Sequence, residues 1–276
     1  MNSSFKYRVI KAYCIVFYAL MIYKWLNGFL LYQLQPSFFY TRQDLATWVF
    51  MQTGLHQWLL NNPFGWILFD ALFYISPFLL FLANKTKKLE TPAAIAMLVI
   101  NWCYVQCYTL YPSNSIEGHT AWLLFPFIFL TRQGQTFLLL YEAVRYFFLY
   151  FFVSAAIWMF AQGGIFHVHE MSGILLYQHQ QLLTNSPDYW HTRFILYLIQ
   201  HRFLSYTLYL SATILELLFI VGFFTKKYDR MLLILFIIFL IADNFIMRIP
   251  YFEVAALALP LFIKNKITAN TNIRIY

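Results

Sequence analysis

The sequence has little charge and few residues that interrupt a helix. Charged side chains account for 11% of its 276 residues, and glycine and proline occur nine times each. A water-soluble domain of this length needs far more charge on its surface, so the low charge excludes that class of protein. The three cysteines form no CxxC pair. They lie within apolar runs, where a thiol usually packs as a small apolar group: Cys14, Cys103 and Cys107.

Long apolar runs fill most of the chain. Hydrophobic residues make up 61% of it, and the mean hydropathy is +0.60. The runs are continuous, as in 231–246, whereas a membrane β-strand alternates polar with apolar residues. We therefore predict an all-α, polytopic integral membrane helical bundle with about eight spans, in a single domain, 1–276. The spans are expected near 9–31, 64–83, 93–112, 118–131, 136–161, 203–224, 231–247 and 250–263.

The fourth of these segments is the shortest. Its apolar core, 121–130, ends just before Arg132, which is typical of a tilted helix or a re-entrant segment. If it does not cross, about seven spans remain. We favour a crossing, because otherwise the basic run 226–230 would lie on the opposite side from the other basic loops.

Basic residues gather on one side of the predicted membrane. By the positive-inside rule, both termini are then cytoplasmic, and we expect a bacterial inner membrane. The net charge of +8 is explained by loops that face anionic lipid, so no nucleic-acid partner is expected. The basic side holds Lys6, Arg8, Lys11, Lys85, Lys87, Lys88, Arg132, Lys226, Lys227, Arg230, Lys264, Lys266 and Arg274, against Arg42, Arg193, Arg202 and Arg248 opposite.

Two segments on the outer side are too long to be plain connectors. In 35–62, apolar residues recur at three-to-four spacing, which favours a helix lying in the membrane interface. The second segment, 163–200, is rich in His, Gln and Tyr and has a turn at 185–188. Its flanks, 173–183 and 189–200, are typical of short interfacial or re-entrant helices.

All seven histidines fall on this predicted outer side, and five of them crowd into one loop: His167, His169, His179, His191 and His201. In extended backbone, two imidazoles two residues apart share a side, which suits proton transfer, substrate contact or a metal ion. The alternative is that these histidines have no chemical role and lie at the membrane–water interface, which suits a side chain with an apolar body and a polar tip. We predict His167, His169 and Glu170 as catalytic residues, with no bound metal.

Glu117 and His119 form a second candidate, in the loop before the fourth span. A carboxylate beside an imidazole can orient the ring as a general base. We predict both as catalytic, converging with His56 and the long His loop. The alternative is a solvated turn, since the surrounding residues have turn composition.

The predicted spans also carry ionisable residues. Each costs about 2.5–3.5 kcal/mol on membrane-insertion scales, so such groups turn inward and pair. Glu142 and Arg145 can pair within one helix, and Asp243 could reach Arg248 or Lys24. The predicted intramembrane polar network comprises Lys24, Asp70, Glu142, Arg145, Glu216 and Asp243.

Several of these features resemble the membrane domain shared by vitamin K-dependent gamma-carboxylases and the bacterial horizontally transferred transmembrane (HTTM) proteins. They are the basic residues Arg8 and Lys11 that open the first helix, the long outer segment after it, and the polar loop before a short fourth span. The block 216–230, with the apolar helix after it, also resembles DoxX-type redox-associated membrane proteins.

The resemblance implies a lysine base for a carboxylase, and that lysine is missing. The corresponding stretch, 154–164, contains no lysine. In the carboxylase the lysine is followed shortly by an acidic and an aromatic residue, and the similar residues here, Asp188-Tyr-Trp190, lie further along the chain. Vitamin K-dependent carboxylation is therefore not expected. A different lipid- or quinone-linked reaction, with histidine in place of lysine, stays open.

Three functions remain. The first is an outer-face, His-rich site that acts on a membrane lipid, a quinone or an exported protein, with no cofactor identified. The second is a non-catalytic accessory or redox-associated protein of a larger membrane complex. The third is a small-solute transporter whose path would be lined by the intramembrane polar residues.

Because histidine titrates near pH 6.5, the outer loop should be pH-sensitive. We predict that activity or partner binding changes between about pH 5.5 and 7.5, which a pH series on the purified protein measures. A flat profile across that interval would remove the histidines from the mechanism.

Overall fold

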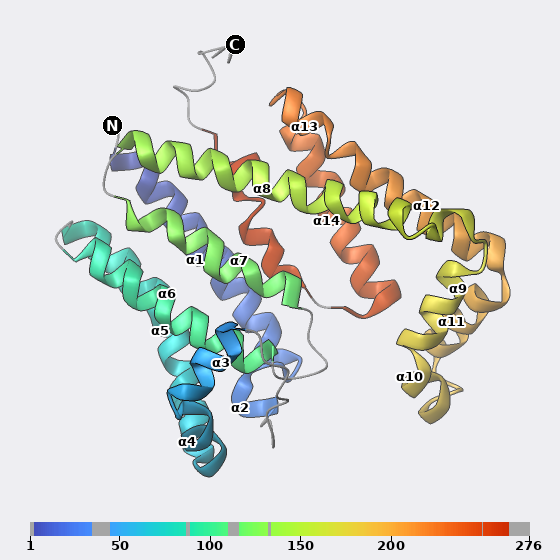
Figure 1. The fold of residues 1–276 in the computed structure, drawn as a ribbon, viewed down its shortest axis with the longest axis horizontal. Helices are drawn as coiled ribbons and strands as arrows, with labels where there is room; N and C mark the ends of the chain where they lie inside the picture. Colours follow the sequence, from blue (N-terminus) through green and yellow to red (C-terminus); the bar gives the residue numbers. More distant parts are fainter. Residues whose placement is uncertain are drawn as a thin grey trace. The chain divides into compact units, whose positions relative to one another are not determined.

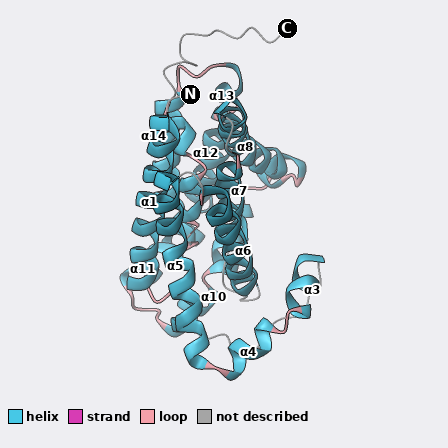
Figure 2. Cartoon of the chain, turned by 90° about the vertical axis from the view of Figure 1, so that its left-hand side faces the viewer, coloured by secondary structure: helices cyan, strands magenta, loops and turns pink. Residues whose placement is uncertain are grey.

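The computed structural model describes residues 3–34, 45–86, 89–109, 116–131, 134–249 and 251–264. Every regular element in these ranges is helical, as the prediction of an all-α fold requires (Figure 2). Within this part of the chain, five helices are long and apolar enough to cross a membrane: Phe5–Leu34, Pro63–Thr86, Gly134–Ala161, Arg202–Phe224 and Asp229–Met247. The chain is therefore a helical protein with at least these candidate spans.

The helices cluster into two compact units. Unit 1 comprises Met1–Arg145 with Pro250–Tyr276, and unit 2 comprises Tyr146–Ile249. The helix α8 (Gly134–Ala161) is continuous through the boundary and contributes residues to both. The single domain predicted for 1–276 stays a prediction.

Unit 1 is built on three long helices, α1, α5 and α6, and the shorter α7 (Figure 1). α5 packs against α1 and α6, and α7 packs against α6. Of the predicted interfacial segment 35–62, residues 35–44 lie outside the described ranges, and the rest forms two short helices. The elements are α1 (Ser3–Leu26), α2 (Leu31–Leu34), α3 (Leu45–Gln52), α4 (Leu55–Asn61), α5 (Pro63–Thr86), α6 (Glu90–Thr109), α7 (Ile116–Phe127), η1 (Ile128–Leu130), η3 (Phe252–Ala256) and α15 (Leu259–Phe262).

Two prolines inside these helices each leave a carbonyl without its helical donor, and a side chain supplies the replacement. Pro77 cannot donate to the carbonyl of Phe73, which instead accepts from the Ser76 hydroxyl at 2.9 Å. Pro126 likewise frees the carbonyl of Trp122, which accepts from the Asn101 amide of α6 at 2.7 Å. The second bond joins two helices, so the break in α7 helps to fix its position against α6.

Aromatic rings fill the interior of unit 1. Phe73 of α5 stacks on Tyr104 of α6 with ring centroids 3.7 Å apart. Tyr13 of α1 stacks on Phe125 of α7 at 5.2 Å. All four residues are buried, with Tyr104 the most exposed at 1%. Stacked aromatic pairs contribute about 0.5–1.5 kcal/mol beyond their buried area, so these contacts align the four helices as well as hiding apolar surface.

Each end of α1 is tied down by a buried ion pair. Near the start, the Lys6 ammonium pairs with Glu90 of α6 and donates to the carbonyl of Thr131 at 2.7 Å. Near the other end, the Lys24 ammonium pairs with Glu253 of η3 and lies 4.3 Å from the centroid of the Tyr108 ring. Lys24 is 7% exposed and Glu253 is 1% exposed. The second pair therefore joins the first long helix to a segment near the other end of the chain.

Unit 2 comprises the rest of α8, the long helices α12 and α14, and a group of short helices. The short helices α9, α10 and α11 gather at one end of α12 (Figure 1). The structure confirms that both flanks of 163–200 are helical with a turn between them, at 187–188, although the first flank is divided into two helices at His179. That these helices are interfacial or re-entrant stays a prediction. The elements are η2 (Gly164–Phe166), α9 (Glu170–Gln178), α10 (Gln180–Asn185), α11 (Trp190–Gln200), α12 (Arg202–Leu218), α13 (Val221–Phe224) and α14 (Asp229–Met247).

The short helices share a core with α12. Met171 and Leu175 of α9, Ile195 and Leu198 of α11, and Tyr209 of α12 are all at least nine-tenths buried and pack as one cluster. The spacing explains the arrangement, because residues three or four apart on each helix face the same side. This core holds α9 and α11 against α12.

Breaking the buried pair at the end of α1 should destabilise unit 1. We predict that Lys24→Met or Glu253→Gln lowers the free energy of unfolding by about 3–5 kcal/mol, because either change leaves its partner's charge buried without compensation. Denaturant unfolding in detergent micelles measures the loss, and the double variant should recover part of it.

The exposed pair between Arg193 and Asp188 provides the control. Its nitrogen and oxygen lie 3.1 Å apart, with the two side chains 69% and 92% exposed. Arg193→Ala should therefore cost less than about 1 kcal/mol. Equal losses for the buried and exposed pairs would contradict the anchoring role of Lys24.

Candidate functional site

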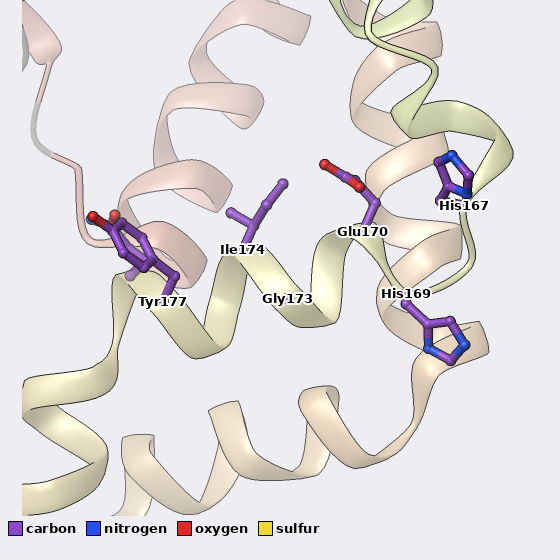
Figure 3. A pocket seen from close by; sticks show the side chains of 7 residues that line it. His167, His169, Glu170, Gly173, Ile174 and Tyr177 are labelled. Carbon is purple, nitrogen blue, oxygen red and sulfur yellow. The ribbon is translucent and has the colours of Figure 1, made fainter.

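An open pocket lies along α9 in unit 2 and has a volume of about 540 Å³. It collects three of the residues that the sequence predicts as catalytic, His167, His169 and Glu170 (Figure 3). We call it the α9 pocket. Its lining residues are His167, His169, Glu170, Gly173, Ile174, Tyr177 and Gln178.

The floor of the pocket is one face of α9. Glu170, Ile174 and Tyr177 follow each other at helical spacing, and Figure 3 shows Glu170 and Ile174 projecting from the same side. Glu170 is half-buried, whereas Tyr177 is 83% exposed. The face therefore presents a carboxylate, an aliphatic side chain and an accessible aromatic ring in a row.

The expectation that His167 and His169 share a side is wrong. His167 has extended backbone (φ −112°, ψ 107°), but His169 has helical backbone (φ −89°, ψ −8°) because it caps α9. Two residues share a side only when the chain is extended through both. Figure 3 shows the His169 ring turned away from the face that carries Glu170. Among the described residues no hydrogen bond joins the two rings, although both are exposed.

Glu117 and His119 lie in the first turns of α7, in unit 1. Their side chains are outside the described part of the structure. Convergence of these residues with His56 and the long His loop stays a prediction.

Two other histidines have a structural role that the sequence does not reveal. His179, after α9, and His191, in the first turn of α11, are both 3% exposed. Their Nε2 atoms donate to the carbonyls of Ile246 at 2.7 Å and Phe245 at 2.8 Å. A carbonyl oxygen only accepts, so Nε2 must carry the hydrogen on both rings.

These two carbonyls belong to the last turn of α14, whose final carbonyls have no helical donor. The histidines therefore cap α14 and attach α9 and α11 to its end. The two rings lie 5.9 Å apart, edge to face. This role could not be predicted from the sequence, because the two histidines are separated along the chain and share no motif. By contrast, His201 is exposed and bonds through Nδ1 to the carbonyl of Tyr197 at 2.8 Å, one turn earlier.

The predicted intramembrane network divides between the units. In unit 1, Lys24 pairs with Glu253, and Asp70 accepts from the Tyr104 hydroxyl at 2.5 Å and from the Tyr32 amide at 2.9 Å. Lys24 is thus paired with Glu253, and a contact of Asp243 with Arg248 or Lys24 stays a prediction.

The other members of the predicted network lie on long helices. Glu142 and Arg145 are on α8, with Arg145 1% exposed, and their mutual pairing stays a prediction. Glu216 of α12 and Asp243 of α14 lie in unit 2, near enough to interact electrostatically. Within the described ranges, no group of three or more His, Cys, Asp or Glu side chains could hold a metal ion.

Comparison of the chain with protein-family models, with curated proteins and with solved structures found no match.

The capping histidines make the end of unit 2 sensitive to acid. Burial lowers the pKa of His179 below 6.5, and nearby His191 and Arg248 lower it further, against the opposing effect of the Ile246 carbonyl. A lowered folded-state pKa means that the unfolded chain takes up the proton first. The stabilisation is therefore complete above about pH 6.5 and is lost as the pH falls through the folded-state value.

We predict that hydrogen exchange of the α9–α11 amides accelerates as the pH drops below about 6.5, after correction for intrinsic exchange. His179→Gln keeps an amide donor but cannot titrate, so it should flatten this dependence. His201→Gln changes an exposed ring and should leave the dependence as it is. An unchanged profile in His179→Gln would assign the acid sensitivity to another group.

Proposed function

We propose that this chain is an integral membrane protein that binds a zwitterionic lipid headgroup in the α9 pocket. The observation that carries the proposal is the composition of the pocket: a carboxylate, two exposed imidazoles and an accessible tyrosine ring on a partly apolar floor. Such a site suits a ligand with both polar and apolar parts.

Charge complementarity narrows the ligand class. Glu170 offers a carboxylate to an ammonium group, and the Tyr177 ring can contact the same cation through its face. The imidazole N–H group of His167 can donate to a phosphate. An amine joined to a phosphate, as in phosphatidylethanolamine, uses all of these groups. A quinone has no cation for Glu170, which makes it the weaker candidate among the predicted substrates.

The finer membrane arrangement belongs to this proposal. Besides the five long helices, α6 spans Glu90–Thr109, and two shorter apolar segments cover Thr120–Leu130 and Phe252–Phe262. Together they support about eight spans. With the basic side cytoplasmic, the α9 pocket would face the outer side of a bacterial inner membrane. Relationship to the HTTM, gamma-carboxylase and DoxX-type proteins also stays a proposal, supported by the residue patterns alone.

Lipid retention tests the function. We predict that Glu170→Gln weakens retention of phosphatidylethanolamine about tenfold, because the amide can accept only a weaker hydrogen bond from the ammonium once the carboxylate charge is removed. Tyr177→Ala should weaken it by about two- to fivefold through loss of the cation–π contact. Native mass spectrometry of the purified protein in mixed phosphatidylethanolamine and phosphatidylglycerol micelles measures the ratio of bound lipids.

Asp188→Asn is the matched control, because Asp188 is an exposed carboxylate between α10 and α11 outside the pocket. It should leave the lipid ratio unchanged. If Glu170→Gln and Asp188→Asn give the same ratio as the parent chain, the α9 pocket does not bind the headgroup.

A further inference from the structure

Glu216 is a carboxylate buried within a candidate span of unit 2. It lies on α12, inside Arg202–Phe224, and is 4% exposed. Its Oε2 atom has no hydrogen-bond partner among the described residues. An ionised carboxylate oxygen is strongly disfavoured in such surroundings unless it is paired. This oxygen therefore needs a ligand, and a proton is the smallest that satisfies it.

A second carboxylate lies nearby. Asp243 of α14 interacts electrostatically with Glu216, and α12 packs against α14 (Figure 1). Tyr209 of α12 interacts electrostatically with Glu216 and also with Glu170 of α9. The Met159 thioether of α8 accepts from Thr213 on the same helix as Glu216. Asp243 is half-buried and Glu216 is buried. Two carboxylates close together, one of them in an apolar interior, favour a state in which one is protonated.

A row of polar side chains leads from this pair toward the α9 pocket. Tyr209, Thr213 and Glu216 recur at helical spacing on α12, and all three are buried. The Thr213 hydroxyl lies between the other two and is 2.9 Å from the carbonyl of Tyr209. Because the three side chains lie on one face of α12, they form a row that runs along the helix.

At the pocket end, Tyr209 meets Glu170 beside Gly164. A Cβ atom added at Gly164 would lie 2.6 Å from the Tyr209 hydroxyl and 3.4 Å from the Glu170 carboxyl carbon. The hydroxyl and the carboxyl group thus both adjoin the space beside the Gly164 backbone, which the side chain of any other residue would fill. Tyr209 also interacts electrostatically with two carboxylates, those of Glu170 and Glu216.

We propose that Glu216 and Asp243 form a proton-binding site in unit 2, in which one proton is shared by the two carboxyl groups and is reached from the α9 pocket past Tyr209 and Thr213. Binding adds one proton to the Glu216 carboxylate and neutralises it, with no change in oxidation state. The site does not depend on what the α9 pocket binds.

Infrared difference spectroscopy on the full chain in hydrated lipid bilayers tests this site. At neutral pH the parent chain should show the carbonyl stretch of a protonated carboxyl group. Glu216→Gln should remove one group's absorbance from that band. Asp243→Asn removes the neighbouring like charge, so the remaining Glu216 should release its proton at a lower pH than in the parent chain.

Asp188→Asn is again the control and should leave the band and its titration unchanged. Absence of the band at neutral pH, or its full retention in Glu216→Gln, would overturn the proposal. If Glu216→Gln does not fold, Asp243→Asn decides alone: a titration identical to that of the parent chain also overturns it.

Discussion

The ion pair between Lys24 and Glu253 is the contact on which the arrangement of unit 1 depends. Neither charge is tolerated alone in an apolar interior, so the last helical segments must return to the first long helix. The same constraint operates elsewhere in the chain. Lys6 is paired with Glu90, and the carbonyls freed by Pro77 and Pro126 receive side-chain donors. Polar groups inside this protein thus determine which helices are neighbours.

Unit 2 satisfies its polar groups differently. Its short helices are attached by histidines that donate to the end of α14, and its apolar cluster holds them against α12. One oxygen of Glu216 is buried without a hydrogen-bond partner among the described residues, as are His191 Nδ1 and Thr192 Oγ1. Of these three atoms, the carboxylate oxygen is the most costly to bury, which makes Glu216 a reasonable place to expect function. By contrast, the α9 pocket is open, and its ionisable groups are accessible to a ligand.

The sequence predicted the helices well, because long apolar runs and three-to-four spacing are local properties. It also predicted that Lys24 would be paired, but not with which residue, since Glu253 is far along the chain and only the fold brings them together. The Asn101 bond is different. Pro126 fixes which carbonyl lacks a donor, so Trp122 could have been named from the sequence, although its donor could not.

The candidate site was predicted only in part. Grouping His167, His169 and Glu170 followed from their adjacency, and the pocket includes all three. The orientation of His169 did not follow, because it depends on where α9 begins, and helix starts are poorly determined by sequence. His179 and His191 looked like further members of the same polar loop. Their buried capping role depends on the end of α14, which the loop's own residues do not encode.

Photo-crosslinking most directly tests the central claim that the α9 pocket receives a lipid headgroup. A phosphatidylethanolamine carrying a photoreactive group near its amine would be incorporated into bilayers with the full chain, and the labelled peptides mapped by mass spectrometry. The account predicts labelling concentrated in Glu170–Gln178 and reduced by excess unlabelled phosphatidylethanolamine. Labelling spread over the long helices, with none in α9, would contradict it.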